Sequence, residues 1–359
     1  MCLCIYILFR TCKRFCVWAP NRVCVCVFLI ASVYVCVSNR ECVRQCSNMS
    51  LKRTNEIYRA PRPMEHPNRA FLQHHLAFPR NYHFILDDTD VCRSNTPFLV
   101  LVVPVAPRNR IARDAIRKTW GNETLVQGEL IRTVFLLGLP SGGNITEQQE
   151  HVSMENLQYH DLIQSNFIDS YINLTIKTMV IMDWLATRCP KVSYAMKIDS
   201  DMFLNVENLN LVRLLMDPAT PRDNYMTGLV WWHSPVIRDP SNKLYMPRWI
   251  MAKLEHPLYP LGMGYVLSLD LPGKLLQASA HIRPIYIEDV YLGMCLKHLG
   301  IAPTNPSDDP TQPPHPNQFR AYLDKYNRCT FSKIITYILG SSEQLVTFWT
   351  DLKKPGPPC

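Results

Sequence analysis

Apolar and polar positions divide the chain into parts of different character. Fifteen consecutive residues, 23–37, carry no charge, whereas residues 38–91 are polar, are interrupted by prolines and have no steady period. From residue 92 onward, short apolar runs alternate with segments of helical spacing. We therefore expect a tail at 1–22, an apolar span at 23–37, a stem at 38–91 and a folded domain at 92–359.

Strands and helices should alternate at the start of the folded domain. Valine-rich apolar runs predict buried strands at 98–105, 132–140 and 192–198. Helical spacing predicts helices at 111–121, 173–190 and 206–217. Two later strands and one helix are expected at 225–232, 262–269 and 288–300. The alternation predicts an α/β fold with a parallel, doubly wound sheet.

The span at 23–37 has three interpretations. It is shorter than the ~20 residues that usually cross a membrane, so a retained signal-anchor, a cleaved signal peptide and a buried helix are all compatible with it. Basic residues precede it, which favours the anchor, a cytosolic tail at 1–22 and a lumenal folded domain. The net charge of +8 lies largely near this end, and no zinc-finger spacing accompanies it. These features do not indicate a nucleic-acid groove.

Cysteines and glycosylation sequons point to an oxidising, secretory compartment. Nine of the fourteen cysteines lie in the first 46 residues, and the others are Cys92, Cys189, Cys295, Cys329 and Cys359. Those five can form two disulfides with one thiol left over, in pairings that spacing does not decide. Acceptor sequons begin at Asn48, Asn122, Asn144 and Asn173, which is typical of a lumenal domain.

Two aspartates, Asp199 and Asp201, flank Ser200 directly after a predicted buried strand. In open α/β sheets, ligands bind beyond the carboxyl ends of the strands. Carboxylates this close repel one another unless solvent or a cation separates them, and they suit a hard divalent ion such as Mn²⁺ or Mg²⁺. Such an ion can clamp a diphosphate. The alternative is an acidic turn in solvent.

Other charged and aromatic residues are candidates for the same site. Arg113 and Arg117 share one helix face, where arginines suit a phosphate, a carboxylate of the site or plain solvent. Asp289 and its neighbour Glu288 stand at a predicted helix start, where one carboxylate can act as a general base or both can simply stabilise the helix. The acceptor-side candidates are Trp231, Trp232 and Glu288. The two tryptophans can stack on sugar rings or belong to the core.

Six motifs occur together in a specific order: RDAIRKTWG, FLLG, KIDSDMFLN, IRDPSNKLYMPR, GMGYVLS and EDVYLGMCL. With them, the chain from about Cys92 to Cys329 resembles the inverting β1,3-galactosyltransferases of glycosyltransferase family 31 and their β1,3-N-acetylglucosaminyltransferase relatives. The resemblance implies a GT-A-type fold, a Rossmann-like mixed sheet flanked by helices. It also implies a type II Golgi membrane enzyme with UDP-galactose as donor and Mn²⁺ as cofactor.

Roles for individual residues follow from the resemblance. Asp201 would bind the metal, with Asp199 near the metal and the ribose. Asp289 would be the base that deprotonates the 3-hydroxyl of a terminal N-acetylglucosamine or related N-acetylhexosamine on a glycan. That hydroxyl would then displace UDP and form a β1,3 linkage. The donor-binding set is Arg113, Arg117, Asp199, Ser200 and Asp201.

Two positions depart from the family pattern. Ile338 stands where the family usually carries a histidine that is expected to bind the metal, and an isoleucine cannot do so. Water or another residue, with His315 as a candidate, would have to replace it, or metal dependence is weakened. Pro260 stands where the family usually has a cysteine. Alternatives to galactosyl transfer are transfer of N-acetylglucosamine from UDP-GlcNAc, a carbohydrate-binding pseudoenzyme and a metal-dependent phosphohydrolase.

Overall fold

The computed structural model describes residues 82–87, 89–93, 96–206, 209–304, 319, 321, 327–357 and 359, together with the backbone of four strands before residue 38. The chain forms two compact units, Met1–Arg69 and Ala70–Cys359. The predicted stem between residues 38 and 81 lies outside the described residues, as do Asn48 and His315.

The first unit contains a four-stranded sheet in the order β2-β1-β3-β4. Its strands are β1 (Cys2–Ile5), β2 (Phe15–Trp18), β3 (Val23–Phe28) and β4 (Ser32–Val37). The last two, paired antiparallel, occupy the span predicted as a membrane anchor. Among the described residues, no helix has both the length and the apolar character needed to cross a bilayer. The anchor stays a prediction.

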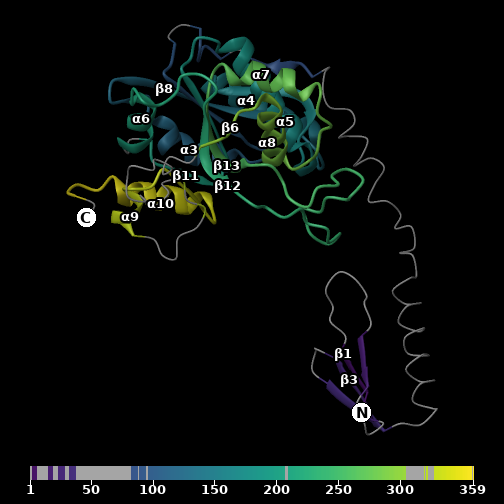
Figure 1. The fold of residues 1–359 in the computed structure, drawn as a ribbon. Helices are drawn as coiled ribbons and strands as arrows, with labels where there is room; N and C mark the ends of the chain where they lie inside the picture. Colours follow the sequence, from purple (N-terminus) through teal and green to yellow (C-terminus); the bar gives the residue numbers. More distant parts are fainter. Residues whose placement is uncertain are drawn as a thin grey trace. The chain divides into compact units, whose positions relative to one another are not determined.

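The second unit is built around a mixed eight-stranded sheet (Figure 1). Its order is β12-β13-β10-β6-β8-β9-β5, and β7 pairs with β8 off this path. The strands are β5 (Phe84–Leu86), β6 (Leu99–Pro104), β7 (Leu125–Val126), β8 (Glu129–Leu139), β9 (Leu162–Ile168), β10 (Tyr194–Ile198), β12 (Met226–Trp231) and β13 (Tyr259–Ser268).

Only the centre of this sheet is parallel. Strands β10, β6, β8 and β9 run parallel to their neighbours in that series, as the alternation of strands and helices predicts. Strand β13 is antiparallel to β10, β12 is antiparallel to β13, and β5 is antiparallel to β9. The prediction of a wholly parallel sheet is therefore wrong, and the mixed sheet implied by the family resemblance is confirmed.

Helices cover both faces of the sheet. They are α3 (Arg110–Arg117), α4 (Ile145–Tyr159), α5 (Leu174–Arg188), α6 (Leu209–Met216), α7 (Leu271–Ser279), α8 (Glu288–Leu299), α9 (Arg328–Phe331) and α10 (Ser342–Leu352). Along β6, Val100 and Val102 join the core under α5, α7 and α8, while Leu99 and Leu101 join the core under α3, α6 and α10. Side chains in a strand alternate between faces, so one apolar run fills both layers.

Strand β9 and helix α4 have no counterpart among the predicted elements. Their apolar patterns are weak because polar residues take core positions. In β9, Gln164 is fully buried and its amide donates to the Gly138 carbonyl at 2.9 Å. In α4, the buried positions are Val152, Glu155 and Asn156. Buried polar groups that find partners in the tertiary structure conceal such elements from periodicity.

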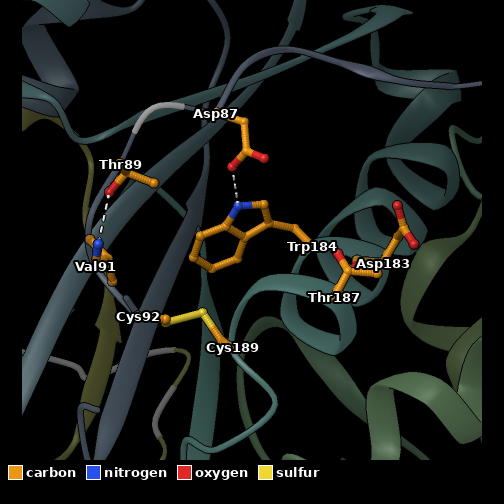
Figure 2. Close-up of a disulfide and its surroundings, with 8 residues drawn as sticks. All are labelled: Asp87, Thr89, Val91, Cys92, Asp183, Trp184, Thr187 and Cys189. Atoms are coloured by element: carbon orange, nitrogen blue, oxygen red, sulfur yellow. Dashed lines mark hydrogen bonds between the residues drawn. A yellow bond between two sulfur atoms is a disulfide. The ribbon is translucent and has the colours of Figure 1, made fainter. Parts of the chain in front are cut away.

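Two disulfides stabilise the second unit, and the buried Cys295 is free. The bridges join Cys92 to Cys189 and Cys329 to Cys359, which confirms two pairs with one cysteine left over. Beside the first bridge, the Trp184 indole donates to Asp87 at 2.9 Å (Figure 2).

Residues just before Cys92 belong to the fold. Asp87 also accepts from Arg188 at 2.6 Å, and β5 pairs with β9. The folded unit therefore includes residues 82–87 and 89–91, which lie within the segment predicted as stem.

Candidate active site

The acidic turn lies at the carboxyl end of β10, as predicted. Asp199, Ser200 and Asp201 connect β10 to the short β11 (Met202–Leu204). The backbone N–H of Asp199 donates to the Met263 carbonyl at 3.0 Å, and the Asp201 carbonyl accepts from Leu339 at 2.8 Å. Because β13 and the segment around Leu339 hold the turn from two sides, its carboxylates are presented at the sheet edge where ligands bind in α/β folds.

Beneath this turn lies a buried cation, Lys197, which no pattern in the sequence marks as part of a site. Its side chain is 5% exposed, and its Nζ lies 2.6 Å from Asp199 Oδ1 and 3.8 Å from Glu288 Oε2. The same ammonium donates to the Gly262 carbonyl. An ammonium is buried only where such partners compensate its charge, so these contacts explain its position.

Helix α8 brings Glu288 and Asp289 to the same place. Asp289 Oδ2 accepts from the Gly262 N–H at 3.0 Å, and Oδ1 accepts from the Val290 N–H at 2.8 Å. Burial raises the pKa of Asp289, against the lowering effects of these two N–H groups and of Lys197. The carboxylate is thus held by fixed donors while it stays a stronger base than an ordinary aspartate.

Glu288, the third acceptor-side candidate, faces the interior of the fold. It is 8% exposed and its Oε1 accepts from the Tyr265 hydroxyl at 2.9 Å. Burial raises the pKa of Glu288 to about 7, although Lys197 lowers it. Its other oxygen, Oε2, would lie 2.6 Å from a Cβ at position 262, so any other residue there would force the Glu288 carboxylate to shift.

A divalent cation fits the acidic turn only in part. Desolvation of its carboxyl and the charge of Asp199 raise the pKa of Asp201, and a bound cation would offset both effects. Within the described part of the chain, no group of three His, Cys, Asp or Glu residues could hold a metal. Two carboxylates suit an ion that keeps waters or takes phosphate oxygens as its remaining ligands.

Ile338 borders this turn. It lies in β14 (Thr336–Ile338), which pairs antiparallel with β11 so that Ile338 faces Met202 across the ladder. The next residue, Leu339, makes the backbone hydrogen bond to Asp201. Position 338 therefore lies next to the acidic turn. The side chain of Ile338 has no atom that could bind a metal there.

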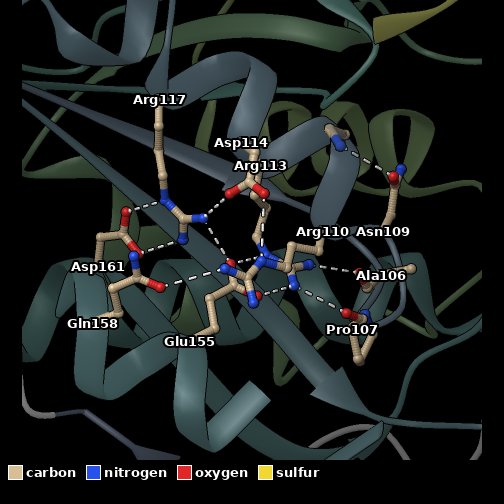
Figure 3. A network of polar contacts seen from close by, with 11 residues as sticks. Ala106, Pro107, Asn109, Arg110, Arg113, Asp114, Arg117, Glu155, Gln158 and Asp161 are labelled. Carbon is tan, nitrogen blue, oxygen red and sulfur yellow. Dashed lines mark hydrogen bonds and ion pairs between the residues drawn. The ribbon is translucent and has the colours of Figure 1, made fainter. Parts of the chain in front are cut away.

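Arg113 and Arg117 lie on one face of α3, as their spacing predicts, but carboxylates of the protein engage both (Figure 3). Arg113 is 1% exposed and binds Glu155 through two nitrogens, at 2.7 and 2.5 Å. Arg117 binds Asp161 through two nitrogens, each at 2.8 Å, and also contacts Glu155 at 2.8 Å.

These pairs join α3 to α4 and to the loop after it. Burial raises the pKa of Glu155, but the two arginines lower it further, so it lies below its ordinary value. Breaking such a buried pair leaves an uncompensated charge and typically costs about 3–5 kcal/mol. These contacts show that both arginines join elements of the fold, and their donor-binding role stays a prediction.

Trp231 and Trp232 are surface residues rather than core. They are 52% and 53% exposed at the end of β12. Two residues further on, Ser234 contacts the Tyr259 hydroxyl at 3.1 Å. Burial, and then the charge of Asp289, raise the pKa of Tyr259 and of the half-exposed Tyr171. The charge of Asp289 therefore acts on both Tyr171 and Tyr259, and nothing in their spacing identifies them in advance.

The three sequons in the described part of the chain differ in the exposure of their asparagines. Asn122 and Asn144 are exposed, whereas Asn173 is 3% exposed and its amide nitrogen donates to the Ile168 carbonyl at 2.8 Å. In a secretory host, we expect glycans at Asn122 and Asn144 but not at Asn173. Treatment with an amidase that removes N-glycans should lower the mass of the full chain less in Asn122→Gln and Asn144→Gln than in wild type. A smaller mass loss in Asn173→Gln would contradict this assignment.

The fold and the site together define an α/β protein with an acidic turn, the buried Glu288 and the partly buried Asp289 at one edge of its sheet. The galactosyltransferase family model matches residues 111–307, more than half of the chain. The chain belongs to this galactosyltransferase family.

Curated relatives agree with this family. Human β-1,3-galactosyltransferase 2 is 40% identical over 278 residues, 77% of this chain and 64% of that protein. Mouse β-1,3-galactosyltransferase 1 is 37% identical over 274 residues, 76% of this chain and 79% of that protein. The chain thus spans less than two thirds of the length of the human relative. A crystal structure of the galactosyltransferase LgtC with donor and acceptor sugar analogs aligns at a TM-score of 0.34 and 9% identity, covering 72% of this chain and 97% of that one.

Proposed function

We propose that this protein is an inverting β1,3-galactosyltransferase with a GT-A-type fold. It transfers galactose from UDP-galactose to the 3-hydroxyl of a terminal N-acetylhexosamine on a glycan, from a Golgi membrane in which an N-terminal anchor holds it. The observation that carries the proposal is the convergence of Asp199 and Asp289 on the Lys197–Gly262 contact. Membership of the family supports the reaction class.

Asp289 acts in this proposal as the general base. Its carboxylate is held at the first turn of α8 by two backbone N–H groups, so it stays oriented without reorganisation. It takes the proton of the acceptor hydroxyl, whose oxygen bonds to the anomeric carbon as the bond to the UDP oxygen breaks. One displacement of this kind inverts the α-linked donor to a β-linked product.

Asp199 and Asp201 bind the donor side. They would hold Mn²⁺, which when bound supplies positive charge to neutralise the departing diphosphate. The exposed indoles of Trp231 and Trp232 offer apolar faces on which an acceptor sugar can stack.

Ile338 favours a second candidate, a pseudoenzyme that keeps the fold and binds carbohydrate without turnover. Its aliphatic side chain next to the acidic turn leaves that turn without an imidazole from β14. The preserved Asp289 geometry weighs against this candidate, because a base without a function need not be held by two fixed donors.

UDP release by the full chain tests the proposal. The assay contains UDP-galactose, a β-N-acetylglucosaminide acceptor and Mn²⁺, and a chelator serves as control. Acceptor-dependent UDP release that disappears on chelation is expected, and UDP-GlcNAc in parallel separates the two donors. Folded protein that binds the glycan but releases no UDP with several donors would support the pseudoenzyme instead.

A further inference from the structure

We propose that Lys197 is a positioning residue that couples the two halves of the site, the acidic turn and the base-bearing helix α8. This inference rests on the proposed function. The carrier of the coupling is one peptide of β13: the Gly262 carbonyl accepts from Lys197, and the Gly262 N–H donates to Asp289 at 3.0 Å. A continuous chain of polar contacts therefore runs from Asp199 through Lys197 and Gly262 to Asp289.

The setting of Lys197 makes this coupling rigid. The side chain is 5% exposed, and its ammonium lies 2.6 Å from Asp199 on one side and 3.8 Å from Glu288 on the other. Its Nζ is also 5.7 Å from the centre of the Tyr265 ring. The acidic turn, strand β13 and helix α8 each supply one of these neighbours, so the ammonium cannot shift without disturbing an element that carries the site.

Glycine at position 262 is part of the same arrangement. A Cβ there would lie 2.6 Å from Glu288 Oε2 and 3.5 Å from Asp289 Oδ2. The missing side chain lets the peptide sit directly against both carboxylates of α8. The Lys197–Gly262 contact thereby determines how far α8 stands from the acidic turn.

Lys197→Met tests the role, because methionine fills a similar volume without the ammonium. Lys177→Met is the matched control. Lys177 is also buried, at 3% exposed, and its ammonium contacts Asp169 at 2.7 Å and the Val105 carbonyl at 2.9 Å, but not Gly262. Both variants should lose stability because each leaves a carboxylate without its cation. Only Lys197→Met should lose kcat strongly, by roughly 10–100-fold as for other residues that orient a reactive group.

The pH dependence of kcat/KM distinguishes a positioning role of Lys197 from a general loss of stability. Lys197 lowers the pKa of Asp289, so its removal should move the acid limb of kcat/KM for the acceptor to higher pH. The other groups that face Asp289 are the carboxylates Asp199 and Glu288 and the hydroxyls Tyr171, Tyr259 and Tyr265. The tyrosines are neutral over the pH range of the acid limb. Without the cation, the negative charges of both carboxylates act more strongly on Asp289, which also raises its pKa.

Hydrogen exchange at the Gly262 amide supplies a readout that does not need turnover. We expect faster exchange in Lys197→Met and wild-type exchange in Lys177→Met. If the methionine variant does not fold, Lys197→Gln replaces it and is judged by the acid limb, because its amide can still donate to Gly262 without the charge. Unchanged amide exchange in Lys197→Met, or an unmoved acid limb with wild-type kcat in either variant, overturns the role of Lys197. Absence of transfer by the wild type refutes the proposed function alone, since the exchange result still decides the coupling.

Discussion

Asp289→Asn is expected to lower kcat for galactosyl transfer by roughly 10²–10⁴-fold, the contribution typical of a general base. The asparagine has nearly the same shape and can still accept from the Gly262 N–H, but it cannot take a proton. Binding of the donor should change little, because Asp289 contacts α8 and β13 rather than the acidic turn. Initial rates at saturating donor and acceptor, with thermal unfolding as a check of the fold, measure the effect.

Glu288→Gln is the matched control for this substitution. Glu288 precedes Asp289 on α8, and its pKa of about 7 means that it is partly protonated near neutral pH. A glutamine still accepts from the Tyr265 hydroxyl, so this variant should keep far more activity than Asp289→Asn. Equal losses in both variants, or normal transfer by Asp289→Asn, would remove the base assignment from Asp289.

The wild-type pH profile should agree with the same assignment. A base works only in its ionised form, and burial raises the pKa of Asp289 above the ordinary value of about 3.9. Transfer should therefore decline as pH falls through this raised pKa, and the decline should begin at a higher pH than for an ordinary aspartate.

Asp201→Ala should lower transfer by about 10³-fold, because a metal that neutralises a leaving group contributes several kcal/mol. The variant should fold normally, since the Asp201 carbonyl, not its side chain, makes the hydrogen bond to Leu339. Asp223→Ala, at an exposed aspartate outside the acidic turn, is the control and should behave like wild type. UDP release over a Mn²⁺ titration measures both variants.

Metal removal and Ile338→His extend this prediction. Chelation should abolish wild-type transfer, and an imidazole at position 338 should lower the Mn²⁺ concentration needed for half-maximal rate, because it adds a ligand beside the turn. Calorimetric Mn²⁺ binding provides a readout without turnover. If chelation and Asp201→Ala both leave the rate unchanged, the acidic turn does not hold a catalytic metal.

Much of the fold could be predicted because its information is local. The valine-rich run of β6 is buried on both faces, and its composition predicts a strand without knowledge of the neighbouring strands. The helix α5 is equally plain from its apolar length. Strand β9 and helix α4 escape notice because Gln164 and Glu155 are buried polar residues, which tertiary partners alone make tolerable.

In the candidate site too, local features could be predicted from the sequence and long-range contacts could not. The position of Asp199 and Asp201 after a buried strand predicts their place at the sheet edge, and the structure has them there. Arg113 and Arg117 share a helix face as predicted, but Glu155, which follows Arg113 by 42 residues and lies on another helix, engages both. Spacing determines which side chains are neighbours on one helix, whereas it says nothing of which charges another helix brings to them.

By itself, the sequence determined the α/β alternation, the carboxylates of the acidic turn and of α8, and the family. These depend on local apolar pattern and on short motifs. Only the tertiary structure decided which strands run antiparallel, the disulfide pairing and the role of Lys197. In the sequence, Lys197 is a lysine in an apolar strand; in the fold, it is a buried cation whose carbonyl partner lies 65 residues further on. Burying that charge is favourable only because β13 places the Gly262 carbonyl, and α8 the Glu288 carboxylate, next to it. No local sequence pattern predicts these long-range contacts.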